Sequence, residues 1–310
     1  MNRLKLAKKS LKGLSIGDAF GESFFGESFF GERAFVLSKI AQREIPTTTW
    51  EFTDDTVMAI AIVEQLKRHE SIVPNELIQL FVENHDKDPN RGYGATARRI
   101  LREVGEGGDW RKITTAVFDG MGSMGNGAAM RVAPIGAYYY DDFEKIKMLT
   151  FDASKVTHAN IEAKAGALAV ALGAALATQI KLHQISLNPH EFINQILAHL
   201  PDTDTRSKIK KSLSVPYSYH IDTVKTILGN GSKIMTQDTV PFTIWCAAHN
   251  LEHFENALWK AVSILGDRDT IGAIVGSITI LSSKEENIPK KWVCAVEDFE
   301  TSIFWNGQNE

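Results

Sequence analysis

The stretch FTDDTVMAIAIV occupies residues 52–63 and joins an acidic cluster to a helical signal. Its apolar part, Val57 to Val63, runs without a break, and Leu66 extends the pattern by one turn. Such a run is typical of a helix that is buried on most sides, although a run this short also fits a core strand. The Asp and Thr residues before it are of the kind that caps a helix N-terminus. We therefore predict a buried helix that begins beside two carboxylates.

A second stretch of the same design lies near the other end of the chain. Residues 266–270 read GDRDT, and an apolar run over residues 271–281 follows with Gly272 and Gly276 one turn apart. Capping explains one acidic residue at a helix start, but two carboxylates in each cluster exceed that need. The alternative is a shared site for divalent cations, because hard cations prefer oxygen ligands and four crowded carboxylates would otherwise repel each other.

Helical patterning extends over most of the remaining sequence. Few segments alternate apolar and polar residues, so the fold is predicted to be mostly or entirely α-helical. No long Gly/Ser-rich or Pro-rich linker divides the chain, and we predict one domain over residues 1–310. Asn160 is placed to cap the longest of the helices. Further helices are predicted at residues 77–82, 93–104, 142–151, 160–179, 189–200, 205–213, 221–228, 240–251 and 254–265.

The composition excludes several classes of protein. The chain has 310 residues, 44% of them apolar, and a net charge of -4, which argues against broad nucleic-acid binding. Cys246 and Cys294 lack CxxC spacing and fit a reducing compartment. The basic N-terminus precedes no apolar stretch of signal-peptide length, and residues 165–177 fall short of the roughly 20 needed to span a bilayer. We expect a cytoplasmic protein without a membrane partner.

A glycine-rich stretch, GMGSMGNGAAMR, covers residues 120–131. Its glycines permit positive φ and close approach of the backbone to a ligand. If a helix begins at Ala128, its free amides could bind phosphate; otherwise the stretch is a flexible loop before a core helix. It is neither a Walker loop nor a dinucleotide fingerprint. Arg131 could pair with an acidic cluster or with ligand phosphate, and we favour a structural ion pair.

Three other polar residues are candidates for chemistry. His158 fits a capping or buried neutral residue better than a catalyst. Glu22 follows GDAFG, residues 17–21, and could act as a general base if its loop reaches the cations, or lie exposed on that loop. Asp18 could cap a turn there. A tandem repeat of GESFF over residues 21–30 indicates a local duplication in a loop.

Five landmarks, in this order, resemble the ADP-ribosylglycohydrolase family, which includes the glycohydrolase that reactivates dinitrogenase reductase. The resemblance runs from Gly13 to about Leu281 and implies an all-α fold with a two-metal cleft. The implied reaction is hydrolysis at the ribose C1″, which releases ADP-ribose from a modified protein or small molecule. The landmarks are GDAFG at 17–21, TDDT at 53–56, GNGAAMR at 125–131, TH at 157–158 and GDRDT at 266–270.

The resemblance also implies a set of site residues. It implies two divalent cations, usually Mg²⁺ or Mn²⁺. The residues that we place at the reaction are Glu22, Asp55 and Asp269. The positions that match the family's metal ligands are Thr53, Asp54, Asp55, Asp267, Asp269 and Thr270. The positions that match its ADP-ribose contacts are Gly92, Gly94, Ser123, Gly125, Asn126 and His158.

The chain departs from the family pattern at one position. Many members carry a Glu four residues after the last glycine of the first landmark, where this chain has Phe25. Glu22 or Glu27 could substitute for it, and we favour Glu22. The departure motivates one alternative function, a module that binds ADP-ribose or a nucleotide without cleaving it. A second alternative is a metal-dependent phosphoesterase, since two cations serve phosphate chemistry equally well. The sequence leaves open the leaving group (Arg, Ser, a nucleic-acid base or a metabolite ester), the native metal, the oligomeric state and the role of residues 181–232.

Overall fold

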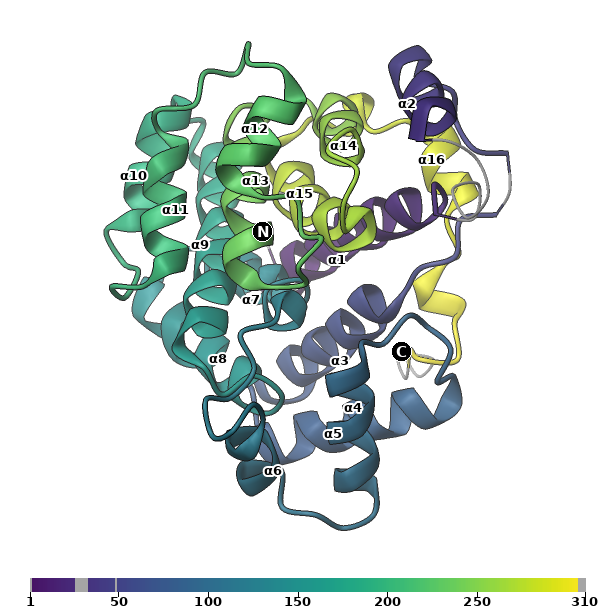
Figure 1. Cartoon of the computed structure of the whole chain (residues 1–310), viewed down its shortest axis with the longest axis vertical. Coiled ribbons are helices and arrows are strands. Elements are labelled where there is room, and N and C mark those ends of the chain that lie inside the picture. The colour runs from purple at the N-terminus through teal and green to yellow at the C-terminus, as the bar shows by residue number, and fades with distance from the viewer. Residues whose placement is uncertain (1, 26–32, 48, 306–310) are drawn as a thin grey trace.

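Two helices from opposite ends of the chain, α1 (Arg3–Glu22) and α15 (Arg268–Ser282), run antiparallel at the centre of the protein (Figure 1). The computed structural model describes residues 2–25, 33–47 and 49–305. A Cβ atom on Gly17 would lie 2.0 Å from the carbonyl oxygen of Gly272, and one on Gly13 would lie 2.4 Å from that of Gly276. Only glycine permits this backbone contact. The glycine pair noted in the sequence of α15 therefore exists to receive α1.

The protein is all-α, as predicted. In the described residues there is no strand, only isolated bridges between Trp50 and Val296 and between Gly125 and Met235. The other helices are α2 (Arg33–Gln42), α3 (Asp54–His69), α4 (Pro74–Lys87), α5 (Ala95–Gly105), α6 (Trp110–Ala116), α7 (Ala133–Tyr138), α8 (Phe143–Lys155), α9 (Ile161–His183), α10 (Pro189–Leu197), α11 (Asp204–Ser212), α12 (Ile221–Leu228), α13 (Thr236–Ala248), α14 (Phe254–Val262) and α16 (Lys290–Ala295).

Each predicted helix overlaps an observed one, and the apolar run after the first acidic cluster is α3 rather than a strand. Five helices were not predicted: α1, α2, α6, α7 and α16. The segment 181–232, which carried no motif, supplies α10, α11 and α12 on one flank of the molecule (Figure 1). The prediction that residues 1–310 form one domain stays a prediction.

α9 is the central helix of the core. It packs against α7, α8, α13 and α15, and Asn160 caps it by accepting a hydrogen bond from the backbone N–H of Glu162. It is longer than the sequence indicated, and by length and composition alone it could cross a membrane. However, 83% of its most apolar window is buried inside the protein. This burial is typical of a core helix rather than a membrane span.

An aromatic cluster holds the C-terminal end of α1 in place. Phe20 stacks on Trp292 with ring centroids 4.4 Å apart, and Trp50, Trp259 and Phe24 pack edge-on or tilted around them. All five rings are buried, and rings packed in this way stabilise a site beyond their area alone. The cluster therefore fixes the position of the last turn of α1, which ends at Glu22.

The C-terminal segment returns to the start of α3. The backbone N–H of Glu297 donates to the carbonyl of Trp50 at 2.9 Å. The guanidinium of Arg91 donates two hydrogen bonds to the Glu297 carboxylate, at 2.6 and 3.0 Å, and a third to the carbonyl of Phe52 at 3.0 Å. Arg91 therefore ties the segment before α3, the loop before α5 and the C-terminal segment together.

Candidate active site

Asp18, in α1, anchors the first acidic segment. Its buried carboxylate accepts hydrogen bonds from the backbone N–H and hydroxyl of Thr53, at 2.9 and 2.8 Å, and from those of Thr56, at 3.1 and 2.5 Å. Thr53 is in turn the N-cap of α3, because its hydroxyl accepts from the N–H of Asp55. Asp18 thus holds the start of a neighbouring helix, which corrects the expectation that it caps a turn of its own segment.

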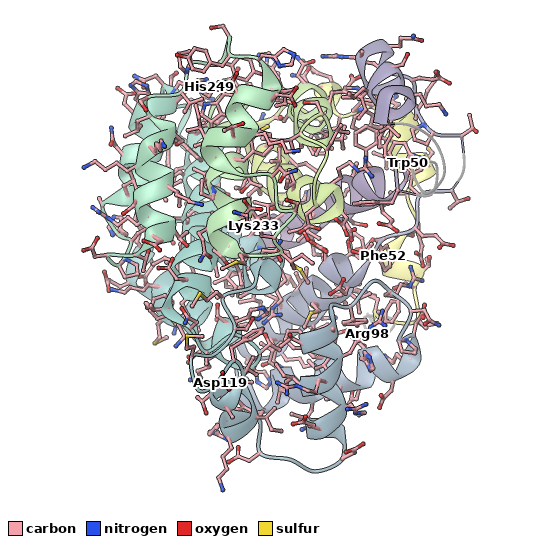
Figure 2. The ribbon with its side chains drawn as sticks, viewed as in Figure 1. Trp50, Phe52, Arg98, Asp119, Lys233 and His249 are labelled. Atoms are coloured by element: carbon pink, nitrogen blue, oxygen red, sulfur yellow. The ribbon has the colours of Figure 1, made fainter. Side chains whose placement is uncertain are left out.

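The two acidic segments meet at Asp55. Its Oδ2 lies 3.1 Å from Thr53 Oγ1 and 3.4 Å from Thr270 Oγ1, in the first turn of α15. Asp55 is 1% exposed, and its other carboxylate oxygen is buried without a hydrogen-bond partner among the described residues. The start of α3 and the start of α15 therefore form one oxygen-lined region. In Figure 2, Phe52 marks the segment that enters this region.

Asn126 holds Asp267, the residue that directly precedes α15. The side-chain amide of Asn126 donates to Asp267 Oδ2 at 2.6 Å and to Thr239 Oγ1 at 2.9 Å. A Cβ on Gly231 would lie 2.5 Å from the Cβ of Asp267, so this loop also needs a glycine. Asn126 is 3% exposed and orients a carboxylate, a task that the sequence, which indicated a ligand contact, did not predict.

The carboxylates crowd each other in a poorly hydrated region. Burial raises the pKa of Asp54, Asp55 and Asp267 well above the usual range, and the neighbouring carboxylates, Asp269 among them, raise it further. Burial also raises the pKa of Asp18 to about 7, although its hydrogen bonds act in the opposite direction. Such a cluster is costly unless protons or cations neutralise it.

The donor set fits a hard divalent cation. It consists of oxygens alone, and one oxygen each of Asp55 and Asp269, both Oδ1, is buried without a hydrogen-bond partner among the described residues. No three acidic, histidine or cysteine side chains of the described residues already converge on one ion-sized point. An ion here would therefore need the hydroxyls of Thr53 and Thr270 or a small shift of the carboxylates.

Glu22 lies at the end of α1 that touches the start of α15. A Cβ on Gly21 would lie 2.2 Å from the carbonyl oxygen of Arg268 and 2.6 Å from the backbone nitrogen of Asp269. Partial burial raises the pKa of Glu22 to about 7; Asp269 and Asp18 add to this rise, and Arg268 opposes it. Glu22 is thus half-buried on a helix end beside the carboxylates, not on an exposed loop.

Phe25 occupies the position where the resemblance implies a glutamate. The guanidinium of Arg268 lies 4.1 Å from the centroid of its ring, a cation–π contact. Both residues line a cavity of about 500 Å³ that reaches Asp267. Glu27, the other candidate for the proton-transfer role, lies outside the described residues.

Arg131, Thr157 and His158 form a buried chain of hydrogen bonds. Fully buried Arg131 donates to the carbonyl of Ala153 at 2.9 Å and to the hydroxyl of Thr157 at 2.7 Å. Among the described residues its partners include no carboxylate, so the expected ion pair is wrong. Thr157 Oγ1 lies 2.8 Å from His158 Nδ1. Thr157 Oγ1 accepts from Arg131 and has one proton of its own; if it donates this proton to Nδ1, the ring proton of His158 is on Nε2.

His158 is a neutral imidazole beside the glycine-rich loop. Burial lowers its pKa to about 3, and the charge of Arg131 adds to the effect. Cβ atoms on Gly125 and Gly127 would each lie 3.0 Å from an atom of its ring. Beside it the Ser123 hydroxyl accepts from the N–H of Gly125 at 3.1 Å. A single 3₁₀ turn, Asn126–Ala128, follows and α7 begins only at Ala133, so the helix considered from Ala128 is absent.

The two glycines before α5 border the same region. Gly92 has a φ of +86°, and a Cβ there would lie 3.4 Å from Asp54 Oδ1. At Gly94, a Cβ would meet no described atom within 4 Å. The N–H of Asp54 donates to the carbonyl of Arg91 at 2.6 Å, which fixes this loop to the start of α3.

The sequence named Asp18 only as a possible turn cap and did not predict its contacts with Thr53 and Thr56, and it gave no indication of Thr239 or of the positioning role of Asn126. The signal for Asp18 was present: an acidic residue between Gly17 and Gly21 in a helix whose neighbours are otherwise apolar or small. A charge in such a place is expected to have several partners. Thr56 belongs to the TDDT landmark, but its contact with Asp18 was not predicted, and nothing in the sequence pointed to Thr239, because a hydroxyl gains its partner only through tertiary contact.

Comparisons with known proteins agree with this arrangement. The family model described as ADP-ribosylglycohydrolase matches residues 1–305. The mouse protein "ADP-ribosylhydrolase ARH3" is 29% identical over 94% of this chain and 87% of its own length, and the human protein of that name is 30% identical over 80% and 75%. The "ADP-ribosylarginine hydrolase Tri1" of Serratia proteamaculans is 22% identical over 94% and 75%.

A solved structure shows a related fold. The chain named "ADP-ribosylglycohydrolase-related protein complex" superposes with a TM-score of 0.67, over 96% of this chain and 93% of that chain. Its sequence is 20% identical, so the likeness concerns the fold alone.

Proposed function

This chain belongs to the ADP-ribosylglycohydrolase family and is a glycosyl-bond hydrolase, and we propose that it releases ADP-ribose from a modified protein or small molecule with the support of two divalent cations, Mg²⁺ or Mn²⁺. The bond cleaved is the glycosidic bond at C1″ of the distal ribose. The relatives named ADP-ribosylhydrolase and ADP-ribosylarginine hydrolase support an ADP-ribosylated substrate.

The observation that carries the proposal is the meeting of two acidic helix starts. Asp55 and Thr270 bring α3 and α15 together at one carboxylate oxygen, and unpartnered carboxylate oxygens lie on both sides of that contact. A purely structural cluster would pair these oxygens with hydrogen-bond donors. The residues that would hold the cations are Thr53, Asp54, Asp55, Asp267, Asp269 and Thr270.

Bound cations would supply orientation of the ribose hydroxyls and a lowered pKa of water. Residues of the chain hold the cation-binding side chains in position. Asp18 fixes Thr53, and Asn126 fixes Asp267, so both halves of the ligand set are pre-positioned. Preorganisation of this kind makes rigid supporting residues as important as the ligands.

Glu22 is the residue best placed to hold and transfer a proton. A carboxyl with a pKa of about 7 can be protonated or ionised at physiological pH, as a general acid or base must be. Its place beside Asp269 also brings negative charge to the region where an oxocarbenium-like transition state would develop. This arrangement favours a hydrolase over the non-catalytic binding module that the replacement by Phe25 had suggested.

The glycine-rich loop provides the binding surface for the diphosphate. With its ring proton on Nε2, neutral His158 can donate to a phosphate oxygen at this loop without titrating near pH 7. Gly92 and Gly94 leave room for the ligand beside Asp54. Both loops approach through glycine backbone, which permits short contacts with a ligand.

Mass spectrometry of reaction products tests the proposal. The substrates are peptides ADP-ribosylated on arginine or on serine, each incubated with Mg²⁺, with Mn²⁺ or with chelator. Intact ADP-ribose that appears only with a cation, and unmodified peptide beside it, is the expected result. AMP and ribose phosphate would instead reveal a phosphoesterase. ADP-ribose binding in calorimetry without turnover on any substrate would establish a binding module and overturn the proposal.

A further inference from the structure

A second cavity, of about 530 Å³, lies between α2 and α14, on the side of the molecule that His249 marks in Figure 2. It shares no lining residue with the carboxylate site. Arg43, at the end of α2, and Lys260, on α14, are the cationic groups on its walls. None of the described residues that line it is acidic. The described walls of this cavity therefore carry positive charge without a carboxylate among them.

Among the described residues, Lys260 forms no ion pair. Its Nζ lies 5.2 Å from the ring centroid of Tyr217 and 5.6 Å from that of Trp245, so its near neighbours are aromatic rings rather than carboxylates. Partial burial lowers the pKa of this ammonium, because lost hydration is not replaced by an opposite charge. A bound anion would supply that charge.

The same cavity has a rigid apolar wall. Tyr217 stacks on His249 with ring centroids 4.9 Å apart, and its hydroxyl donates to Asn250 Oδ1 at 3.0 Å. Trp259 closes the wall and is buried. Burial lowers the pKa of His249 to about 4, so His249 contributes a neutral ring near pH 7. Fixed rings beside a few polar groups are typical of a small-molecule site.

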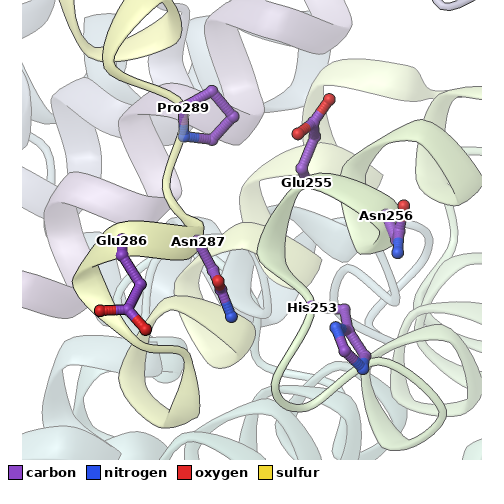
Figure 3. A pocket seen from close by; sticks show the side chains of 6 residues that line it. All are labelled: His253, Glu255, Asn256, Glu286, Asn287 and Pro289. Carbon is purple, nitrogen blue, oxygen red and sulfur yellow. The ribbon is translucent and has the colours of Figure 1, made fainter.

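The neighbouring cavity has walls of the opposite charge. It has a volume of about 400 Å³ and shares His253 and Asn256 with the cavity of Arg43 and Lys260 (Figure 3). Its walls carry the carboxylates of Glu255 and Glu286, from α14 and from the segment before α16. These charges would repel an anion. The separation of charge between adjoining cavities directs an anion to one of them.

We propose that the cavity lined by Arg43, Lys260, Tyr217 and Trp259 binds a phosphomonoester of a small aromatic compound, separately from the carboxylate site. Arg43 and Lys260 match the two charges of a phosphate dianion, and a planar guanidinium fits two phosphate oxygens. The volume exceeds that of phosphate alone, and the aromatic wall accommodates the organic group.

Isothermal titration with phenyl phosphate, inorganic phosphate and phenol tests the proposal on the full chain. Phenyl phosphate is expected to bind more tightly than phosphate, and phenol to bind undetectably. Lys260→Gln and Arg43→Gln should each weaken phenyl phosphate binding by about tenfold. Tyr217→Leu should weaken binding of phenyl phosphate but not of phosphate. Lys147→Gln, which removes one exposed charge on α8, is the matched control and should change nothing.

A competition arm separates this site from the catalytic one. Saturating ADP-ribose should leave the affinity for phenyl phosphate unchanged, and this result does not depend on whether the chain hydrolyses any substrate. Displacement by ADP-ribose, equal affinity in Lys260→Gln, Arg43→Gln and the control, or no binding at millimolar phenyl phosphate would each overturn the proposal. Circular dichroism of every variant shows whether a lost affinity comes from a lost fold.

Discussion

Thr270 Oγ1 lies 3.4 Å from Asp55 Oδ2, although 215 positions separate the two residues in the chain. Asp55 is in the first turn of α3, and Thr270 is in the first turn of α15. The N-termini of two helices therefore face the same carboxylates, and their dipoles favour negative charge there. The dipoles offset part of the repulsion among the acidic residues, and a cation would offset more.

Asp55→Asn is expected to lower kcat/KM for release of ADP-ribose by more than about a hundredfold, because a neutral amide cannot replace a cation-binding carboxylate. Calorimetry with Mn²⁺ should show weakened binding in parallel. Asp86→Asn, which changes an exposed carboxylate on α4, is the control. Turnover at the normal rate by Asp55→Asn would refute the metal-ligand assignment.

Glu22→Gln is expected to reduce kcat by roughly 10² to 10⁴, the usual contribution of a positioned acid or base. Affinity for Mn²⁺ should change little, since Glu22 is not among the proposed ligands. Glu285→Gln, an exposed residue, serves as the matched control. If Glu22→Gln retains full activity, proton transfer belongs to a different group, and Glu27 becomes the next residue to replace.

Without metal, the protein is expected to lose stability as pH rises from about 4 to about 7. Burial and repulsion raise the folded-state pKa values of Asp18, Asp54, Asp55 and Asp267, so folding favours their protonated forms. Stability from such groups is complete below the unfolded pKa and is lost as pH rises through the folded one. Thermal melts in chelator at several pH values measure this loss.

Mn²⁺ should restore much of the stability lost at pH 7, because it binds the ionised form. Asp55→Asn in chelator should show a shallower decline with pH than the unaltered chain. A melting temperature in chelator that stays level between pH 5 and pH 7 in both proteins would argue against the crowded-carboxylate account.

His158 gives the opposite pH dependence. Its folded-state pKa of about 3 lies below the ordinary value of 6.5, so its contribution to stability is present above pH 6.5 and is lost as pH falls toward 3. His158→Gln removes that titration. Denaturant unfolding between pH 7 and pH 4 should therefore show a smaller loss in the variant, and equal losses in the two proteins would contradict a buried neutral histidine.

Gly17→Ala is expected to destabilise the protein by at least about 3 kcal/mol, because the added methyl would meet the backbone of α15 and no side chain can move aside. The Cβ would lie 2.0 Å from the carbonyl oxygen of Gly272. Gly94→Ala is the control, since no described atom lies within 4 Å of the new Cβ. Chemical denaturation of both variants compares the free energies of unfolding; similar values would show that the α1–α15 contact adapts.

The sequence predicted the elements that carry a periodic apolar face or a marked cap. α3, α9 and α12 were found within a few residues, because caps and apolar runs are local signals. α1 was missed: its three glycines at four-residue spacing lower helix propensity, and their purpose is clear only when α15 lies against them. α7 is short and begins with Pro134 inside its first turn, and its pattern was merged with the glycine-rich loop.

The site was predictable in part for the same reason. Clustered carboxylates beside helix starts identified Asp55 and Thr270 as candidates, because two acidic residues and a threonine within a few positions can be recognised in the sequence. The residues that hold Thr53 and Asp267 in place were not visible in the sequence. Asp18 and Asn126 act across gaps of 35 and 141 positions, and such pairings depend on how helices cross rather than on neighbouring residues.

The pairing of α1 with α15 also determines when the site can form during synthesis of the chain. A ribosome adds roughly 5 to 20 residues each second, so α1 waits on the order of ten seconds or more for the helix that covers its glycines. Until then the bare backbone along Gly13, Gly17 and Gly21 has no native partner. A nascent chain that still lacks α15 therefore also lacks Asp269 and Thr270, so the site cannot form before that helix is synthesised.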